Sequence, residues 1–468
     1  MKYRIEHDTL GEVKVPEDAY YGAQTQRAVE NFRISSLRLP PSFIRAQAII
    51  KKAAATANMA AGKLDKDIGA AVVSAAGEVI EGRFDGQFVV DVFQAGAGTS
   101  QNMNINEVLA NRASELLGGD RGVYDRVHPN DHVNMAQSTN DTIHVAIHIS
   151  AYTEIQKRLL PAMLRLERAL EAKAVEFDGV VKSGRTHLQD AVPMRLGQEF
   201  GAYAAMIRKG RRRVERASDA LLEIGIGGTA LGTGINTDHD YRRNAITAIN
   251  EMTGFEFREP EDIFEAMQNL DAVVEVAGAL RVVTTGLRKI ADDFRLLSSG
   301  PRTGLAEIRL PAVQPGSSIM PGKVNPVLAE MLNMVCFHAL GCDTCLLTAG
   351  QAGQLELNVM MPVAAYNLLL EIEILTGGIG SFVDRCVTGI TANEKQCRLF
   401  AEKSAALATA LNPYVGYHRA AELAKEALDK DELIRDLVLS AKIMDKEKLE
   451  KILDIHDMTI DPAEKNDE

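Results

Sequence analysis

Apolar residues recur every three to four positions along most of this chain, the spacing of helices that bury one face. The early segments with this pattern are short, at 42–61, 66–82 and 105–117. Five later segments are much longer, at 140–177, 194–223, 262–298, 326–350 and 360–385. Helices of about 25 to 38 residues span roughly 37 to 57 Å, more than a compact domain, so we expect them to pack as a bundle.

The two ends of the chain depart from this pattern. Residues 3–16 alternate around a Leu10-Gly11 turn and predict a short hairpin. After Ala392 the predicted helices are short and charged, at 402–411, 416–428, 431–440 and 446–453. We therefore predict a mainly α subunit with three domains: a mixed, mostly helical N-terminal domain at 1–134, a central long-helix bundle at 135–391 and a small helical domain at 392–468. Bundle stripes rich in Leu, Val, Ile and Ala also suggest burial between subunits of a homo-oligomer.

Composition and charge narrow the partners and the compartment. The chain has 468 residues, 46% of them hydrophobic, and a net charge of -12 with both signs interspersed, so we expect neither nucleic acid nor a membrane surface as a partner. The start, MKYRIEHDTLGEVKVP, lacks the regions of a secretory signal, and we expect no membrane span. Five cysteines, an odd number, fit reduced thiols and a cytoplasmic protein.

One segment, PGSSIMPGKVNP at 315–326, concentrates chemically useful groups. Within nine residues it carries two hydroxyls, an ammonium and a carboxamide: Ser317, Ser318, Lys323 and Asn325. The interspersed glycines and prolines indicate a shaped loop rather than a helix or strand. Asn325 is expected to cap the next helix, with Pro326 at its first position. A lysine and exposed amides beside a helix start predict a site for an anion.

Three other polar stretches precede long helices in the same way. They are AGAGTSQNMNINE at 95–107, VNMAQSTND at 133–141 and SGRTHLQDAVP at 183–193. Any one of them alone is typical of a helix N-cap. Four such helix starts converging on one place, with a lysine and a histidine among them, would line a pocket suited to carboxylates.

These stretches resemble the signatures of the aspartase/fumarase superfamily, and PGSSIMPGKVNP is the most specific of them. The likeness covers almost the whole chain, through YYGAQTQRAVENF, GGTALGTGIN, SSGPRTGLAEIRLP and GQLELNVMMP. The resemblance implies a three-domain, mostly helical subunit and a homotetramer with long helices at its centre. It also implies reversible anti elimination from a small dicarboxylate of the succinyl type, giving fumarate through an enediolate without an organic cofactor.

The resemblance also implies roles for the residues of the loop and the histidine. Ser317 would be the base, acting as an alkoxide. Lys323 and Asn325 would hold one substrate carboxylate, and Ser318 would join the other. His187 would orient the amino group or a water, although position alone equally fits a histidine packed at a helix entry.

The remaining roles fall on distant helix starts. By the same resemblance, Thr99, Ser138 and Thr139 would contact the carboxylate that becomes the enediolate. Asn140 would lie near the leaving group, and Thr186 near the second carboxylate. Because superfamily tetramers build each site from three subunits, we expect no complete site in a monomer.

The leaving group is the narrower question. NMAQSTND resembles aspartate ammonia-lyases, since fumarases more often carry a second serine in place of Thr139, and HLQDAVP and GQLELNVM point the same way. GGTALGTGINT and HPNDHVN fit fumarases as well, and Ile143, His144 and Val145 depart from the F-P-T of both families. Deamination of L-aspartate is therefore expected, with fumarate hydratase acting on L-malate as the alternative. An inactive structural homologue is a third alternative.

Three motifs resemble other sites but lack essential parts. His144 and His148 have a metal-like spacing, yet HVAIH lacks the glutamate of HExxH. Cys342 and Cys345 lie in a predicted helix without a second ligand pair. The glycine-rich GIGGTALGTG has no Lys-Ser or Lys-Thr and does not follow a strand. We therefore expect no metal and no nucleotide.

Overall fold

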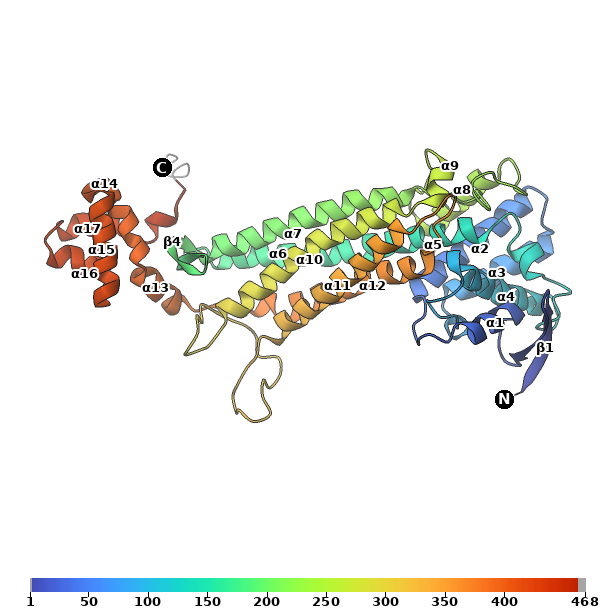
Figure 1. Cartoon of the computed structure of the whole chain (residues 1–468), viewed down its shortest axis with the longest axis horizontal. Coiled ribbons are helices and arrows are strands. Elements are labelled where there is room, and N and C mark those ends of the chain that lie inside the picture. Colours follow the sequence, from blue (N-terminus) through green and yellow to red (C-terminus); the bar gives the residue numbers. More distant parts are fainter. Residues whose placement is uncertain (1, 462–468) are drawn as a thin grey trace. The chain divides into compact units, whose positions relative to one another are not determined.

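A computed structural model describes residues 2–461 as a mainly α protein with several long helices (Figure 1), which confirms the predicted fold class. Residues 462–468, the end of the predicted C-terminal domain, lie outside the described residues. The chain divides into two compact units, each formed by three stretches of sequence. Unit 1 comprises Met1–Pro161, Gly210–Thr284 and Phe337–Thr376, and unit 2 comprises Ala162–Lys209, Thr285–Cys336 and Gly377–Glu468. The three folding domains drawn from the sequence, with their boundaries near 134 and 391, stay a prediction.

Unit 1 begins with the predicted hairpin. Strands β1 (Tyr3–Asp8) and β2 (Gly11–Pro16) pair antiparallel, with Asp8 opposite Gly11. Seven helices lie entirely within this unit: α1 (Ala23–Asn31), α2 (Pro41–Ala60), α3 (Lys66–Ile80), α4 (Thr99–Leu116), α5 (Thr139–Glu154), α8 (Tyr241–Thr253) and α9 (Ile263–Gln268).

Helix α2 is central to the packing of unit 1. It contacts α3, α5 and α8, and its buried face is rich in alanine, including Ala48, Ala53 and Ala54. Small side chains let the neighbouring helices approach closely, so this face can be covered from several sides. A polar side chain on this buried face must therefore find its partners within the protein, which matters for Lys51, a residue that is 1% exposed.

Five long helices follow α5 along the chain (Figure 1): α6 (Leu160–Glu176), α7 (Leu196–Ser218), α10 (Asp271–Leu297), α11 (Val327–Gln351) and α12 (Met361–Arg385). A π-helical turn, Ile155–Leu159, joins α5 to α6, so the predicted segment 140–177 is helical as far as Glu176. In unit 2, Phe200, Phe294 and Phe382 stack with ring centroids 5.4 and 5.5 Å apart and join α7, α10 and α12. These contacts confirm the predicted bundle.

The rest of unit 2 is a set of short elements. Strands β3 (Val181–Thr186) and β4 (Gln189–Arg195) form a hairpin, and β5 (Ile308–Arg309) pairs with β6 (Thr391–Ala392). The C-terminal helices are α13 (Glu394–Lys403), α14 (Asn412–Val415), α15 (Tyr417–Lys430), α16 (Ile434–Ser440) and α17 (Lys446–Ile452). They close over their own core, in which Leu411, Leu423, Val438 and Leu449 are fully buried.

Two predicted helices are wrong in their bounds. The segment 262–298 is broken into α9 and α10, because Asn269 has an extended backbone, with φ −111° and ψ 159°. The apolar spacing continues across this break, so periodicity cannot detect it. The segment 402–411 is mostly a 3-10 helix, Ala405–Leu411, and the preceding α13 was missed because it buries few apolar residues.

Two helices complicate the expectation that the chain has no membrane span. Val327–Gln351 and Met361–Gly389 are long and apolar enough to cross a membrane, by length and composition only. Core helices of soluble proteins pass the same test. Here Asp343 of the first segment pairs with Arg281 of α10, with an N–O distance of 3.2 Å, as expected of a helix packed within a bundle.

Candidate active site

The loop at 315–326 closes on itself, as the sequence predicts for a shaped loop. The Gly316 N–H donates to the Lys323 carbonyl at 2.9 Å, and the Asn325 side-chain amide donates to the Gly316 carbonyl at 2.6 Å. A Cβ at position 316 would collide with the backbone of Lys323, so only glycine fits here. The loop therefore has a defined shape before any ligand binds.

The predicted helix cap at Asn325 is wrong. The Pro326 carbonyl accepts the Glu330 N–H at 3.1 Å, which places the first helical bond one residue later than expected. Helix α11 accordingly begins at Val327, and the Asn325 side chain turns back into the loop.

Ser317 lies at a turn of this loop where its side chain bonds to the backbone. Its Oγ accepts backbone N–H groups from Ile319 at 3.2 Å and from Met320 at 3.0 Å. Ser317 and Lys323 line the same pocket of ≈ 500 Å³, and the Lys323 side chain is exposed. Two N–H donors aimed at one oxygen would lower the cost of negative charge on it.

The stretch at 183–193 is a hairpin rather than the helix entry that the sequence predicts. Thr186 at the end of β3 faces Gln189 at the start of β4, so His187 and Leu188 form a two-residue turn. Both have positive φ, 56° and 59°, the values of a type I′ turn that normally selects Asn-Gly. A histidine and a leucine in this conformation are strained, and such strain concentrates at functional sites. Both side chains are exposed.

A buried carboxylate ties this hairpin to the base of the loop. Glu307 is fully buried and lies just before β5. Its oxygens accept from Arg185 at 2.9 and 3.0 Å, and the Lys182 ammonium is 3.5 Å away. Both basic residues belong to β3, so the strand that carries Thr186 is fixed to the segment that leads into the Ser317 loop.

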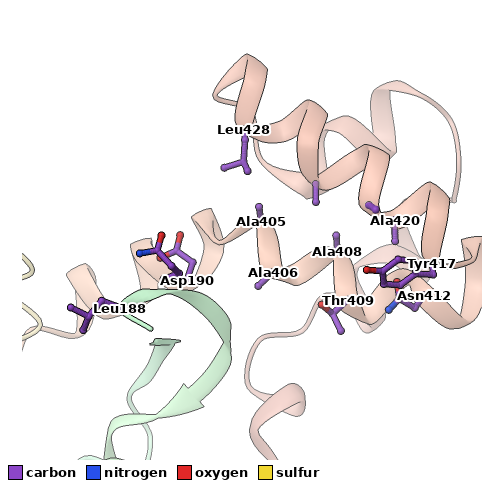
Figure 2. Close-up of a pocket in the computed structure, with 13 residues that line it drawn as sticks. Leu188, Asp190, Ala405, Ala406, Ala408, Thr409, Asn412, Tyr417, Ala420 and Leu428 are labelled. Atoms are coloured by element: carbon purple, nitrogen blue, oxygen red, sulfur yellow. The ribbon is translucent and has the colours of Figure 1, made fainter. Parts of the chain in front are cut away.

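A pocket of ≈ 510 Å³ lies beside the hairpin tip in unit 2 (Figure 2). Leu188 and Asp190 line one side, and small residues such as Ala405, Ala408 and Ala420 line the other. Among the described residues that line it, Asp190 alone carries a charge. A dicarboxylate would be repelled there, so this pocket does not fit the predicted ligand.

In unit 1, Thr99 opens α4 after a sharp bend. Ala97 and Gly98 both have positive φ, 60° and 87°, and the Ala97 N–H donates to the Val359 carbonyl at 2.8 Å. The GQLELNVMMP stretch, which contains Val359, therefore positions the start of α4. The Thr99 side chain is exposed.

Ser138 and its neighbours open α5. Ser138 is the N-cap: its Oγ accepts the Asn140 N–H at 3.2 Å, while its own N–H donates to the Asp141 carboxylate at 2.8 Å. The capping interpretation is thus correct for Ser138. Thr139 has a different partner, because its Oγ1 accepts from the Asn102 side-chain amide of α4 at 3.2 Å. This bond joins the two helix starts.

The glycine-rich segment GIGGTALGTG packs against the start of α5, a role that the sequence did not reveal. The Asp141 carboxylate accepts N–H groups from Gly227 at 3.0 Å and Thr229 at 3.1 Å. The Asn140 amide nitrogen donates to the Ala230 carbonyl at 2.7 Å. The segment therefore orients the Asn140 side chain.

His144 and His148 are packing residues of α5. The His144 Nδ1 lies 2.9 Å from the Asn140 carbonyl, and its Nε2 accepts the Gly225 N–H at 3.3 Å, so both ring nitrogens have backbone partners. Burial lowers the pKa of each imidazole to about 4. Within residues 2–461, no group of three or more His, Cys, Asp or Glu side chains is arranged to hold a metal ion.

The predicted site residues thus fall into two sets. Unit 1 gathers those at the starts of α4 and α5: Thr99, Ser138, Thr139 and Asn140. Unit 2 carries those of the hairpin and the loop: Thr186, His187, Ser317, Ser318, Lys323 and Asn325. Sequence reasoning missed Asn102 and the glycine-rich segment, whose contacts are made only in the folded chain.

Comparison with known proteins defines the class first. A family described as "Lyase" matches residues 11–341, and one described as "Fumarase C C-terminus" matches residues 407–460. The aspartate ammonia-lyase of Bacillus subtilis (strain 168) is 48% identical over 458 residues, covering 98% of this chain and 96% of that protein. The class II fumarate hydratase of Halobacterium salinarum is 49% identical over 458 residues, covering 98% and 97%.

A solved structure agrees with these relatives. The fumarate lyase:delta crystallin from Brucella melitensis, bound to cobalt, superposes with a TM-score of 0.95 at 48% identity and covers 98% of this chain and 100% of that one. This chain therefore belongs to the aspartase/fumarase superfamily of lyases. Relatives with the two activities are about equally similar to it, so identity alone does not separate ammonia-lyase from fumarase.

Because His187 lies in a strained turn, a substitution can remove its imidazole without disturbing the hairpin, so its chemical and structural roles can be tested separately. Asn adopts positive φ readily, so His187→Asn should keep or improve hairpin stability while removing the imidazole. We expect it to lower kcat/KM at least about tenfold. Leu188→Gly is the matched control in the same turn, and it should raise the melting temperature without this loss of activity. Equal kinetic losses in both variants would show that turn geometry, not the imidazole, matters.

The two buried histidines predict acid sensitivity. Their pKa values fall from 6.5 to about 4 on folding, so the unfolded state binds protons first and stability is lost as pH falls from 6.5 to 4. The loss should reach up to about 3 kcal/mol per imidazole. At fixed protein concentration, the difference between the urea midpoints at pH 7.5 and pH 5 should shrink by about half in His144→Gln, because His148 still contributes. His239→Gln, whose side chain is 94% exposed, should keep the wild-type dependence. A difference between the two midpoints in His144→Gln equal to that of the wild type would contradict the prediction.

Proposed function

We propose that this protein is an aspartate ammonia-lyase, which eliminates ammonia from L-aspartate to give fumarate. The observation that carries the proposal is the environment of Ser317, whose Oγ accepts two backbone N–H groups beside an exposed lysine. The reaction must remove a poorly acidic C–H proton next to a carboxylate. A serine can do this only as an alkoxide, and the two donors stabilise that form.

The proposed mechanism has two steps. The Ser317 alkoxide takes the C3 proton, and the electron pair moves into the adjacent carboxylate to give the enediolate. Its new charge is stabilised by hydroxyl and N–H donors at the helix starts, with Thr99, Ser138 and Thr139 as the proposed partners. The enediolate then collapses, the bond from C2 to the substrate's ammonium group breaks, and NH3 leaves from the opposite face, near Asn140 and His187.

The remaining groups bind substrate. Lys323 and Asn325 would hold one carboxylate, and Thr186 and Ser318 the second, because charge-assisted hydrogen bonds give the strongest hold on a carboxylate. We further propose that the working enzyme is a homotetramer in which three subunits contribute to each site.

The orientation of Asn140 suits a leaving group that donates a hydrogen bond, as the ammonium of L-aspartate does. Its amide nitrogen is already engaged with the Ala230 carbonyl, so its oxygen is the atom left for a ligand. An ammonium group can only donate hydrogen bonds and therefore suits this acceptor. The hydroxyl of malate can donate as well, so fumarate hydratase remains the alternative activity, and the fumarase relatives support it.

The substrate is tested by following fumarate absorbance with L-aspartate and L-malate offered separately. The proposal predicts fumarate from L-aspartate, and ammonia released in equal amount. Fumarate from L-malate alone would identify a fumarase. No fumarate from either substrate, in a folded tetramer, would favour an inactive structural homologue.

The base is tested by Ser317→Ala. Removing the alkoxide should lower kcat by about 10³ or more with little change in melting temperature, because general-base catalysis contributes about 10² to 10⁴ and the loop is exposed. Ile319→Ala, in the same loop and 83% exposed, keeps the backbone N–H and is outside the pocket lining, so as the control it should keep normal kcat. Near-normal turnover by well-folded Ser317→Ala would refute the assignment.

The charge of Lys323 is tested separately from the base. Lys323→Met removes the ammonium that we propose for a substrate carboxylate, so KM should rise by about tenfold to hundredfold, the cost of a charged hydrogen bond. A KM equal to that of the wild type would contradict this role. Lys52→Met, a similar change on helix α2, should leave KM unchanged.

A further inference from the structure

A buried lysine lies behind the start of α5. Lys51 of α2 is 1% exposed, and its Nζ donates to the side-chain oxygens of Asn102 at 2.8 Å and Asn134 at 3.0 Å. Both acceptors are neutral amides. Burial lowers the pKa of Lys51 to about 7, and the Asp141 carboxylate opposes this shift. Burying an amine among amides is costly, so a use for it is expected.

The first consequence concerns the Asn102 side chain. Its Oδ1 accepts from Lys51, so its Nδ2 must face the other way, and it donates to Asn134 at 3.1 Å and to Thr139 at 3.2 Å. In its ammonium form Lys51 has no acceptor, so the amide cannot turn over without placing N–H against N–H. Lys51 thereby fixes which end of Asn102 meets Thr139.

The second consequence concerns the Thr139 hydroxyl. Its oxygen receives the Asn102 N–H, so its own hydrogen cannot point at Asn102 and is available to a ligand. A carboxylate can only accept hydrogen bonds, so a threonine held as a donor suits it. Without Lys51, only the bond from Asn102 to Asn134 opposes a turned amide, and in the turned form the Thr139 hydroxyl donates inward to the amide oxygen instead.

We propose that Lys51 is a positioning residue that, through Asn102, holds the Thr139 hydroxyl as a hydrogen-bond donor to the substrate carboxylate. This inference rests on the proposed function in one respect, namely that Thr139 contacts a dicarboxylate. Lys51 itself need not touch substrate. The chain Lys51–Asn102–Thr139 links α2, α4 and α5, so three helices set the polarity of one hydroxyl.

The test is a double-mutant cycle between Lys51→Met and Thr139→Val. Thr139→Val removes the hydroxyl and should lower kcat/KM about tenfold to hundredfold in the wild-type background. In the Lys51→Met background the hydroxyl is already turned inward, so Thr139→Val should cost less than about threefold. The same cost in both backgrounds would overturn the proposal, because a merely structural role for Lys51 gives independent effects.

Two further variants keep the test decisive. Lys52→Met makes the same change one residue along, at a half-buried position, and should leave both the activity and the cost of Thr139→Val unchanged. If Lys51→Met does not fold, Asn102→Asp replaces it: the carboxylate keeps a partner for Lys51 but has no N–H for Thr139. The cost of Thr139→Val should again shrink below about threefold, and a full cost would refute the proposal.

The double-mutant cycle is measured with whichever of L-aspartate and L-malate the wild-type protein converts. A mistaken substrate assignment would therefore appear in the wild-type activity, whereas a mistaken role for Lys51 would appear only in the interaction between the two mutations. If neither is converted, the same cycle is measured by calorimetric binding of fumarate. A wild-type protein that neither turns over these substrates nor binds fumarate would overturn both proposals.

Discussion

The buried carboxylate of Asp141 holds the predicted substrate-binding face of unit 1 together. Its two oxygens accept backbone N–H groups from Ser138, Gly227 and Thr229, so one side chain fixes both the start of α5 and the glycine-rich segment. Burial raises its pKa to about 7, while these three bonds and the charge of Lys51 oppose the rise. The directions of Ser138, Thr139 and Asn140 all follow from this anchored turn.

In unit 2, Glu307 plays the same part as Asp141: it is a buried carboxylate that fixes two segments to each other. This fully buried carboxylate has the two cations of β3, Arg185 and Lys182, as partners and fixes the hairpin to the segment before the Ser317 loop. Buried ion pairs add little net stability, because desolvation offsets the attraction, but breaking one leaves a costly unpaired charge. Such pairs therefore specify geometry, which a site built from loops and strained turns requires.

The sequence predicts the parts of this molecule that depend on local pattern. Long apolar periodicity predicts the bundle helices, and PGSSIMPGKVNP predicts a shaped loop with reactive groups. The β3–β4 hairpin was missed because its turn, His187-Leu188, lacks the Asn-Gly signal of its conformation. Lys51 was missed because nothing local separates it from Lys52, although one is buried and the other is only half-buried. Contacts across the fold, which no local pattern encodes, make that difference.

The two donors to the oxygen of Ser317, the proposed base, belong to its own loop. The N–H groups of Ile319 and Met320 reach its oxygen only while the backbone keeps this turn, and the turn depends on the closure between Gly316 and Lys323. The basicity of the proposed alkoxide is therefore coupled to loop shape. If the loop opened, Ser317 would lose these donors and its alkoxide would take a proton from water, so the proposed mechanism requires the closed form. Such coupling would keep a strong base inactive in water without any additional control.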